Sequence, residues 1–356
     1  MKRIEEIDPN FQVNDFLPQG YSFLDPREEP FQLYGIVSNE EGSFCRLPLD
    51  FLPQCSEGVR DLARHLAGAC VRFSTDSSGL CVLWELLGQG NMGHFTACGQ
   101  SGMELFEETD GGVRQTANLI PQMDNGRGCC SLQRAFIPLA SGLRHYALYL
   151  PLYNGLKQLS LGFAPGARVE AGRRPRIAKP LVFYGSSITQ GGCAAKTGSC
   201  YTTLLARRLD AAQINLGFSG NAKGEESMAR YIAGLEMSVF ILDYDHNAPS
   251  VEHLSATHEP FFRIVRQAQP QLPIVLVSKP DFDRDIPGNR LRRDVIVRTY
   301  ANALAAGDKN VYFVDGEHFF GAADRDLCTV DGCHPNDIGF LRMADTLEPV
   351  LRHILG

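Results

Sequence analysis

Two short segments carry residue types that could perform acyl transfer through a serine nucleophile. Residues 185–189 read Gly-Ser-Ser-Ile-Thr, and Asp331 stands three residues before His334. A serine hydroxyl is a weak nucleophile until a neighbouring base removes its proton. An Asp and a His on one turn can approach closely, so that the carboxylate accepts a hydrogen bond from imidazole Nδ1 while Nε2 faces the serine. The pattern therefore predicts a hydrolytic site in which His334 is the base and Asp331 orients it.

The same chemistry needs hydrogen-bond donors for the oxyanion of the tetrahedral intermediate. Gly220 and Asn247 stand in polar segments that follow two predicted strands. The N–H of Gly220 can approach a substrate without a side chain in the way, and Asn247 can offer a side-chain N–H. For both residues, and for the Asp331 turn, an ordinary role in loop or capping geometry is the alternative.

Two neighbours of these candidates suggest other roles. Cys333 could act as a thiol nucleophile, but a residue adjacent in sequence is expected to point its side chain away from His334. His246 could line the site, although a loop histidine that faces solvent is the better interpretation. We assign neither residue to the catalytic site.

The segment Gly88–Gly93 matches the dinucleotide-binding pattern Gly-x-Gly-x-x-Gly. That fingerprint requires a helix whose N-terminus receives the pyrophosphate, within a strand–helix–strand unit. The residues that follow, 94–102, contain too much glycine for such a helix. We interpret the segment as a glycine-rich loop that binds no nucleotide.

The second half of the sequence has the alternating pattern of an α/β domain. Five strands, each followed by a helix, predict a parallel sheet covered on both faces, and ligands of such sheets bind at the carboxyl ends of the strands. The expected strands are Pro180–Tyr184, Gln213–Leu216, Ser238–Tyr244, Pro273–Val277 and Asn310–Val314, and the expected helices are Tyr201–Leu209, Glu225–Leu235, His253–Gln267, Leu291–Ala306 and Asn336–Ile354.

The first half is β-rich, with one short helix expected at Glu57–Leu66. Short apolar or alternating runs separated by turn residues predict a β-sandwich or jelly roll. The expected strands are Phe31–Val37, Cys70–Phe73, Leu80–Leu87, Val113–Ala117, Ala135–Leu139, Tyr146–Leu152 and Gln158–Phe163. The segment Pro165–Lys179, rich in Gly, Pro and Arg, separates the halves, so we expect two domains, residues 1–170 and 176–356.

Charge and hydropathy limit the classes of partner that the protein is expected to bind. The sequence has 34 Lys and Arg against 41 Asp and Glu, a formal charge of −7, which makes it a poor candidate for holding a nucleic-acid backbone by bulk charge. It contains no run of 18 apolar residues, so we expect no membrane contact. The first residues turn acidic at once and lack the apolar core of a signal peptide, which predicts a cytoplasmic protein.

Eleven cysteines occur without a Cys-x-x-Cys pair or zinc-ligand spacing. In a reducing compartment, free and mostly buried thiols are the ordinary outcome. The sequence therefore predicts neither a metal site nor a cofactor.

Taken together, these segments resemble the sequence blocks of the SGNH hydrolases, also called GDSL hydrolases, over Lys179–Gly356. The first block usually reads Gly-Asp-Ser-Leu. The resemblance makes Ser187 the nucleophile and Ser186 the replacement for the Asp. The last block, Asp-x-x-His-Pro, is met in full by residues 331–335.

The two middle blocks match less completely. The glycine of the second block falls on Gly220, and the third, usually Gly-x-Asn-Asp, keeps only Asn247. By resemblance the oxyanion hole consists of the Ser187 N–H, Gly220 and Asn247. The family's fold implies a flavodoxin-like, three-layer α/β/α domain with a five-stranded parallel sheet.

The first half resembles the β-sandwich domain that precedes one SGNH subgroup and is named for a Gly-x-Asp-Leu-Tyr motif. Residues 102–106 match this motif, with Glu104 and Phe106 in place of Asp and Tyr. Residues 46–48 and 71–77 extend the match. Members of the subgroup are mostly esterases, and deacetylation of sugars is the usual proposal for them.

These features lead to a metal-independent, acetylesterase-like serine hydrolase. It would cleave small O-acyl groups, above all O-acetyl groups on carbohydrates, through an acyl-enzyme on Ser187. An acyltransferase with the same triad is the alternative among enzymes. A carbohydrate-binding protein with an inactive hydrolase domain is the alternative of another class. The expected partner is a small ester or acetylated oligosaccharide. The sequence leaves open whether the protein forms a homo-oligomer.

Overall fold

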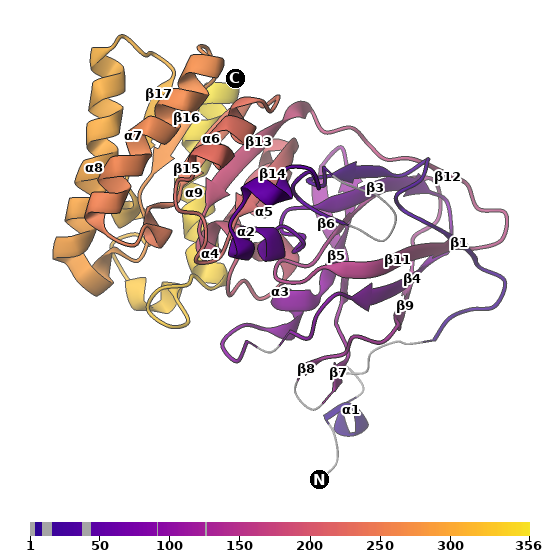
Figure 1. Ribbon diagram of the computed structural model, residues 1–356. Helices are drawn as coiled ribbons and strands as arrows, with labels where there is room; N and C mark the ends of the chain where they lie inside the picture. Colours follow the sequence, from indigo (N-terminus) through magenta and orange to yellow (C-terminus); the bar gives the residue numbers. More distant parts are fainter. Residues whose placement is uncertain (1–3, 9–15, 38–43, 91, 125–126) are drawn as a thin grey trace.

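The computed structural model describes residues 4–8, 16–37, 44–90, 92–124 and 127–356. Figure 1 shows a strand-rich body formed by the first half of the chain and a helix-covered body formed by the second half. Asn91, inside the glycine-rich loop, lies outside the described residues.

The strand-rich body is a sandwich of two antiparallel sheets. One sheet has the order β1 (Ser22–Leu24), β11 (Leu156–Phe163), β4 (Gly79–Leu86) and β9 (Gln133–Pro138). The other has the order β12 (Val169–Ala171), β3 (Cys70–Thr75), β10 (Arg144–Tyr149), β5 (Met103–Thr109) and β6 (Gly112–Leu119), with β2 (Gln32–Tyr34) also paired to β3. Trp84 lies in the core between the sheets. The predicted β-sandwich is confirmed.

The helix-covered body is built on a five-stranded parallel sheet of order β14 (Ala211–Gly217), β13 (Ile177–Gly185), β15 (Val239–Asp243), β16 (Ile274–Val277) and β17 (Val311–Val314). This 2-1-3-4-5 order is that of the flavodoxin-like fold. The predicted three-layer α/β/α domain is therefore confirmed.

Two buried clusters cover the faces of this sheet. On one face pack α6 (Glu226–Ala233), α7 (Val251–Ala268) and α8 (Ile286–Ala305), and on the other pack α5 (Tyr201–Leu209) and α9 (Asp337–Leu355). Both faces are apolar, as a parallel sheet requires. Among the helices of the described residues, none is long and apolar enough to cross a membrane.

The predicted strands and helices of the second half all form, with ends shifted by up to five residues. In the first half, four strands were not predicted: β1, β7 (Met123–Asp124), β8 (Arg127–Gly128) and β12. The residues of β5 were recognised only as part of the Gly-x-Asp-Leu-Tyr motif. Residues 94–102 do contain a helix, α3 (Ala97–Ser101), contrary to expectation. Its start is stabilised by Thr96, whose side chain accepts a hydrogen bond from Gly99 N–H.

Arg46 joins the two bodies through a fully buried guanidinium. Its Nη1 donates to the carbonyl oxygens of Asn215 (2.6 Å) and Gly217 (3.0 Å) at the end of β14. Its Nε and Nη2 donate to the carbonyls of His65 and Leu62, which belong to the first half. The cation therefore finds acceptors on both sides of the junction, as a buried charge must.

The Gly-x-Asp-Leu-Tyr motif forms a second junction. The carboxylate of Glu104, fully buried, accepts hydrogen bonds of 2.7 Å from the N–H of Gly198 and from Lys196 Nζ. The ring of Phe106 lies 4.3 Å from the Arg207 guanidinium carbon on α5, a cation–π contact. Both varied positions of the motif thus contact the second half of the chain.

His65 makes the Arg46 junction sensitive to acid. Burial, and then the Arg46 charge, lower the pKa of His65 to about 4. The unfolded chain binds a proton at this residue near pH 6.5 and the folded chain does not, so stability is present above about pH 6.5 and is lost as the pH falls towards 4. We expect about 2 kcal/mol of unfolding free energy to be lost between about pH 7.5 and about pH 5.

Urea unfolding at the two pH values, on the wild-type protein and on His65→Gln, measures this contribution. The variant should lose about 2 kcal/mol less than the wild type over the same interval. Equal losses in both proteins would show that His65 does not titrate abnormally.

Candidate active site

A sharp turn at the end of β13 presents Ser187. The strand ends at Gly185, and α4 (Ser187–Gln190) begins at once, capped by Ser186, whose hydroxyl accepts from the N–H of Ile188 at 3.1 Å. A Cβ at Gly185 would overlap the carbonyl oxygen of Asp243. Glycine is therefore required for α4 to pack directly on the edge of the sheet.

Ser187, His334 and Asp331 form a continuous hydrogen-bonded relay. Ser187 Oγ lies 3.0 Å from His334 Nε2, and His334 Nδ1 lies 2.8 Å from Asp331 Oδ2. The other carboxylate oxygen of Asp331 accepts from the backbone N–H of His334 (2.7 Å) and of Cys333 (3.0 Å). The three residues predicted to be catalytic therefore lie together, in the order that base-activated attack requires.

The surroundings of His334 favour its protonated form. The Cys333 sulfur, and after it the Asp331 carboxylate, raise the pKa of His334 above its usual range, whereas burial acts in the opposite direction. For Asp331, burial favours the neutral acid, but the hydrogen bonds from His334 and Cys333 hold its pKa at about 2. The ionised carboxylate can therefore stabilise an imidazolium at His334.

The two further oxyanion candidates are tied to each other and to α4. Asn247 Nδ2 donates to the carbonyl of Phe218 at 2.9 Å, which uses one of its two hydrogens. The next residue, Ser219, donates its N–H to the side chain of Gln190 on α4. Gly220 has a φ of +67°, and a Cβ there would meet nothing within 4 Å. Its left-handed conformation suits glycine, and its exposed side is open to a ligand.

The sandwich also reaches this site, through two residues that the sequence did not single out. The ring of His94, in the loop before α3, lies 5.9 Å from the His334 ring, centroid to centroid. Tyr153 Oη, from the segment after β10, donates to the carbonyl of Ser187 at 2.9 Å. No local motif distinguishes either residue, because only the packing of the two bodies brings them to Ser187.

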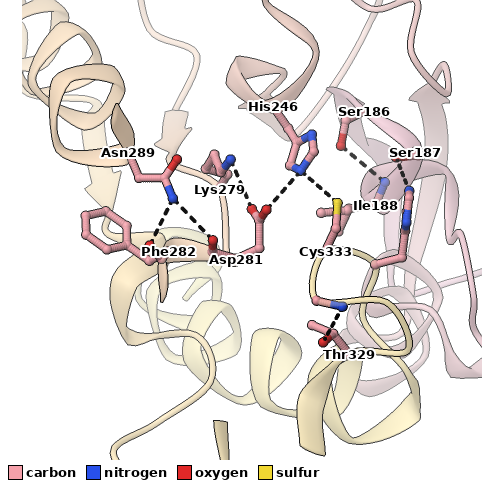
Figure 2. A network of polar contacts seen from close by, with 12 residues as sticks. Ser186, Ser187, Ile188, His246, Lys279, Asp281, Phe282, Asn289, Thr329 and Cys333 are labelled. Atoms are coloured by element: carbon pink, nitrogen blue, oxygen red, sulfur yellow. Dashed lines mark hydrogen bonds and ion pairs between the residues drawn. The ribbon is translucent and has the colours of Figure 1, made fainter. Parts of the chain in front are cut away.

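Two sequence-based expectations beside the site are wrong. Cys333 does not point away from His334: its sulfur lies within 4.8 Å of ring nitrogen and carboxylate atoms of His334 and Asp331. His246 does not face solvent, because its Nε2 lies 3.1 Å from Cys333 Sγ and 3.3 Å from a carboxylate oxygen of Asp281 (Figure 2). Gly332, directly before Cys333 and His334, has a φ of +79°.

A serine–histidine–aspartate relay at the carboxyl edge of a 2-1-3-4-5 parallel sheet defines a hydrolase of the α/β/α class. Residues 178–352 match the GDSL-like lipase/acylhydrolase family, and residues 21–169 match the GxDLY family, the N-terminus of SGNH-hydrolase-type esterases. The chain belongs to the SGNH/GDSL hydrolase superfamily, in the group with an N-terminal GxDLY domain.

Solved structures share the whole architecture. A GDSL-like lipase from Bacteroides ovatus is 28% identical with a TM-score of 0.84, over 94% of this chain and 98% of that chain. A salicylyl-acyltransferase from a tetracycline biosynthetic pathway is 20% identical with a TM-score of 0.78, over 95% of this chain and 98% of that chain. A family two carbohydrate esterase from Clostridium thermocellum, in complex with cellohexaose, is 16% identical with a TM-score of 0.62, over 92% of this chain and 99% of that chain. The last two show the shared fold alone.

Among proteins known by sequence, a GDSL lipase of Mycobacterium tuberculosis is 37% identical over 94 residues, which are 25% of this chain. The match spans 37% of the length of that relative.

The contact between α3 and the loop after α4 offers a test of how the sandwich supports the site. A Cβ at Gly99 would overlap the carbonyl oxygen of Ala194, a backbone atom that cannot rotate away. We expect Gly99→Ala to lower the free energy of unfolding by about 1–3 kcal/mol. Urea unfolding provides the measurement.

Gly93→Ala is the matched control, because a Cβ at Gly93 meets nothing within 4 Å. It should change the unfolding free energy by less than about 0.5 kcal/mol. If Gly99→Ala were as mild as this control, the two bodies would not be in close contact at α3.

Proposed function

We propose that the protein is a serine esterase that hydrolyses small O-acyl esters, above all O-acetyl groups on carbohydrates. The observation that carries the proposal is the Ser187–His334–Asp331 relay, with hydrogen bonds of 3.0 and 2.8 Å. It sits where ligands of open parallel sheets bind, at the carboxyl end of β13.

In the first half of the reaction, His334 Nε2 accepts the proton of Ser187 while Oγ attacks the ester carbonyl carbon. The imidazolium that forms is stabilised by Asp331, which holds Nδ1–H. As the tetrahedral intermediate collapses, His334 returns this proton to the leaving alcohol, and the acyl group remains on Ser187.

In the second step of the reaction, a water molecule gives its proton to His334 and attacks the acyl-enzyme. This step releases the carboxylic acid and restores Ser187. The oxyanion formed in each half is held by the N–H groups of Ser187 and Gly220 and by the Asn247 amide. The tie between Asn247 and the carbonyl of Phe218 fixes the amide plane for this role.

Hydrolysis is favoured over acyl transfer by the access of water to the base. The side chains of His334 and Asp331 keep 25% and 34% of their surface exposed, so water reaches the imidazole without displacing a protein element. Transfer to an alcohol depends on excluding water from the acyl-enzyme. The described residues leave this side of the relay open.

The carbohydrate part of the proposal has two supports. Over 92% of its length, this chain shares its two-part fold with a carbohydrate esterase bound to cellohexaose. The sandwich also presents an exposed histidine, His94, next to the relay. A polar, solvent-facing group at this position can donate to a sugar hydroxyl, whereas a lipid chain would require an apolar surface.

Replacement of the nucleophile tests the reaction. Ser187→Ala should lower kcat for hydrolysis of p-nitrophenyl acetate about a thousandfold or more, because the acyl-enzyme cannot form. Ser186→Ala is the matched control: it removes the cap of α4, costs about 1 kcal/mol of stability and keeps most of the activity. Activity retained in Ser187→Ala but lost in Ser186→Ala would move the nucleophile to the other serine.

Replacement of His94 tests the substrate class. His94→Ala should lower kcat/KM on an acetylated xylo-oligosaccharide about tenfold, mainly through KM, because a sugar hydrogen bond is lost. Its kcat/KM on p-nitrophenyl acetate should change by less than about twofold. Another exposed histidine, His318, provides the control variant His318→Ala, for which both values should stay unchanged. Equal loss on both substrates would show that His94 supports the relay instead of binding sugar.

A further inference from the structure

Beside the relay, three side chains from separate loops bring donor atoms of three chemical kinds together. We propose that His246, Asp281 and Cys333 form a binding site for a thiophilic divalent cation such as Zn²⁺, and that the bound cation inhibits the enzyme through His334. The binding stands on the geometry of this cluster alone, whereas the inhibition rests on the proposed esterase function.

The donor atoms of the three side chains lie close enough together to bind one ion. His246 Nε2 lies 3.1 Å from Cys333 Sγ and 3.3 Å from Asp281 Oδ2, and the three donor atoms lie within 4.8 Å of one another (Figure 2). In a tetrahedral zinc site, ligand bonds of about 2.0–2.3 Å separate such atoms by about 3.4–3.6 Å. The two distances to His246 Nε2 already differ from these values by only a few tenths of an ångström. The Asp281 and Cys333 side chains would adjust around the ion, and a solvent molecule would supply the fourth ligand.

The arrangement is not a second catalytic triad. In a triad, the carboxylate binds one imidazole nitrogen and the nucleophile the other. Here the Asp281 oxygen and the Cys333 sulfur both face Nε2 of His246. One hydrogen on Nε2 cannot point at both partners at once, whereas a cation among the three atoms binds all of them. Thiolate with imidazole is also the ligand set that favours zinc.

The donors are fixed by contacts outside the cluster. Asn289 Nδ2 donates to the carbonyls of Asp281 (3.2 Å) and Phe282 (2.9 Å), which holds the backbone of the carboxylate ligand. Lys279 Nζ lies 3.3 Å from the second oxygen, Oδ1, of Asp281. Asp281 and Cys333 are buried, at 5% and 7% exposure. Such supporting contacts orient metal ligands and maintain their affinity.

Two other groups of possible ligands near the relay are weaker candidates. One joins His94 and Cys193 to His334, and the other joins Asp331 and Cys333 to His334. Both depend on His334, whose two ring nitrogens already contact Ser187 and Asp331. In the first group, His94 is also exposed. The cluster of His246, Asp281 and Cys333 needs no atom of the relay.

A cation can reach this cluster from solvent and would act on the relay. Asp281 and Asp331 both border a surface cavity of about 370 Å³, whose rim carries two further aspartates and two arginines. A metal about 2.3 Å from Cys333 Sγ would lie within about 7 Å of a His334 ring nitrogen. The bound cation would neutralise the negative charges of the Cys333 thiolate and the Asp281 carboxylate beside His334, which opposes the imidazolium that each step of the reaction creates.

Binding also exchanges protons in a measurable way. Imidazole and thiol groups must give up the protons at their donor atoms before these atoms can bind a metal ion. A cation that binds Nε2 and the thiolate of Cys333 therefore displaces protons to solvent. Metal affinity and proton release can both be followed without any assay of hydrolysis.

The decisive experiment is a Co²⁺ titration of the full-length Ser187→Ala protein, followed by its absorption spectrum. Co²⁺ replaces Zn²⁺ and reports a thiolate ligand by a sulfur-to-cobalt charge-transfer band. We expect one equivalent of cobalt with this band, displaced by Zn²⁺. Asp281→Asn and His246→Gln, made in the same background, should weaken binding at least about tenfold, and Cys333→Ser should remove the band.

Cys193→Ser is the matched control, because Cys193 is also buried beside His334 but belongs to the weaker group. It should leave the cobalt spectrum and affinity unchanged. Absence of the charge-transfer band, or its loss in Cys193→Ser with retention in Asp281→Asn, would overturn the site. Because Ser187→Ala has no nucleophile, these outcomes do not depend on the esterase function.

Inhibition is measured separately, on protein with Ser187 intact. Saturating Zn²⁺ should lower p-nitrophenyl acetate hydrolysis at least tenfold, and a chelator should restore it. The concentration for half-inhibition should rise at least tenfold in Asp281→Asn, relative to the zinc-free rate of the same variant. Unchanged inhibition in this variant would overturn the link between the cluster and the relay. A protein that binds cobalt as expected but hydrolyses no ester would contradict the proposed function alone.

Discussion

A buried guanidinium must give its hydrogen bonds to acceptors inside the protein, and Arg46 meets this requirement only where the two halves of the chain join. Four backbone carbonyls accept from it, two in the sandwich half and two at the end of β14. Separation of the halves would break the two hydrogen bonds from Arg46 to Asn215 and Gly217 and expose these groups to water. The turn that carries Gly220 begins just after these carbonyls, so the junction also fixes one wall of the candidate site.

Close packing at the carboxyl edge of the sheet is a second constraint on this wall. Cβ atoms at Gly185 and Gly217 would overlap Asp243 O and Gln190 N. The two glycines let α4 lie directly on the strand ends, where Ser187 meets a histidine that comes from the far end of the sequence. The shape of the site therefore depends on the lack of side chains at these two glycines as much as on the groups that react.

The sequence was sufficient for features that short segments determine. The parallel sheet could be predicted because apolar strands alternate with amphipathic helices, and Asp331 with His334 could be paired because three residues of one turn separate them. His94 could not be placed at the site, since the packing of two domains brings it there. The cluster of His246, Asp281 and Cys333 was also missed, because metal-ligand patterns are recognised by local spacing and these residues lie on three distant loops.

Glu104 and Phe106 give the motif that names the N-terminal domain a physical meaning. Both side chains point into the second half of the chain, where Lys196, the N–H of Gly198 and Arg207 contact them. The motif thus holds the two halves of the chain together, because the other half presents cationic and N–H groups that bind its carboxylate and its ring. A hybrid protein that combines this sandwich with a foreign hydrolase domain would bury an uncompensated carboxylate unless the loop carrying residues 196–198 were transplanted with it. The two halves are consequently exchangeable only as matched pairs, and substitutions on the two sides of the junction are constrained to change together.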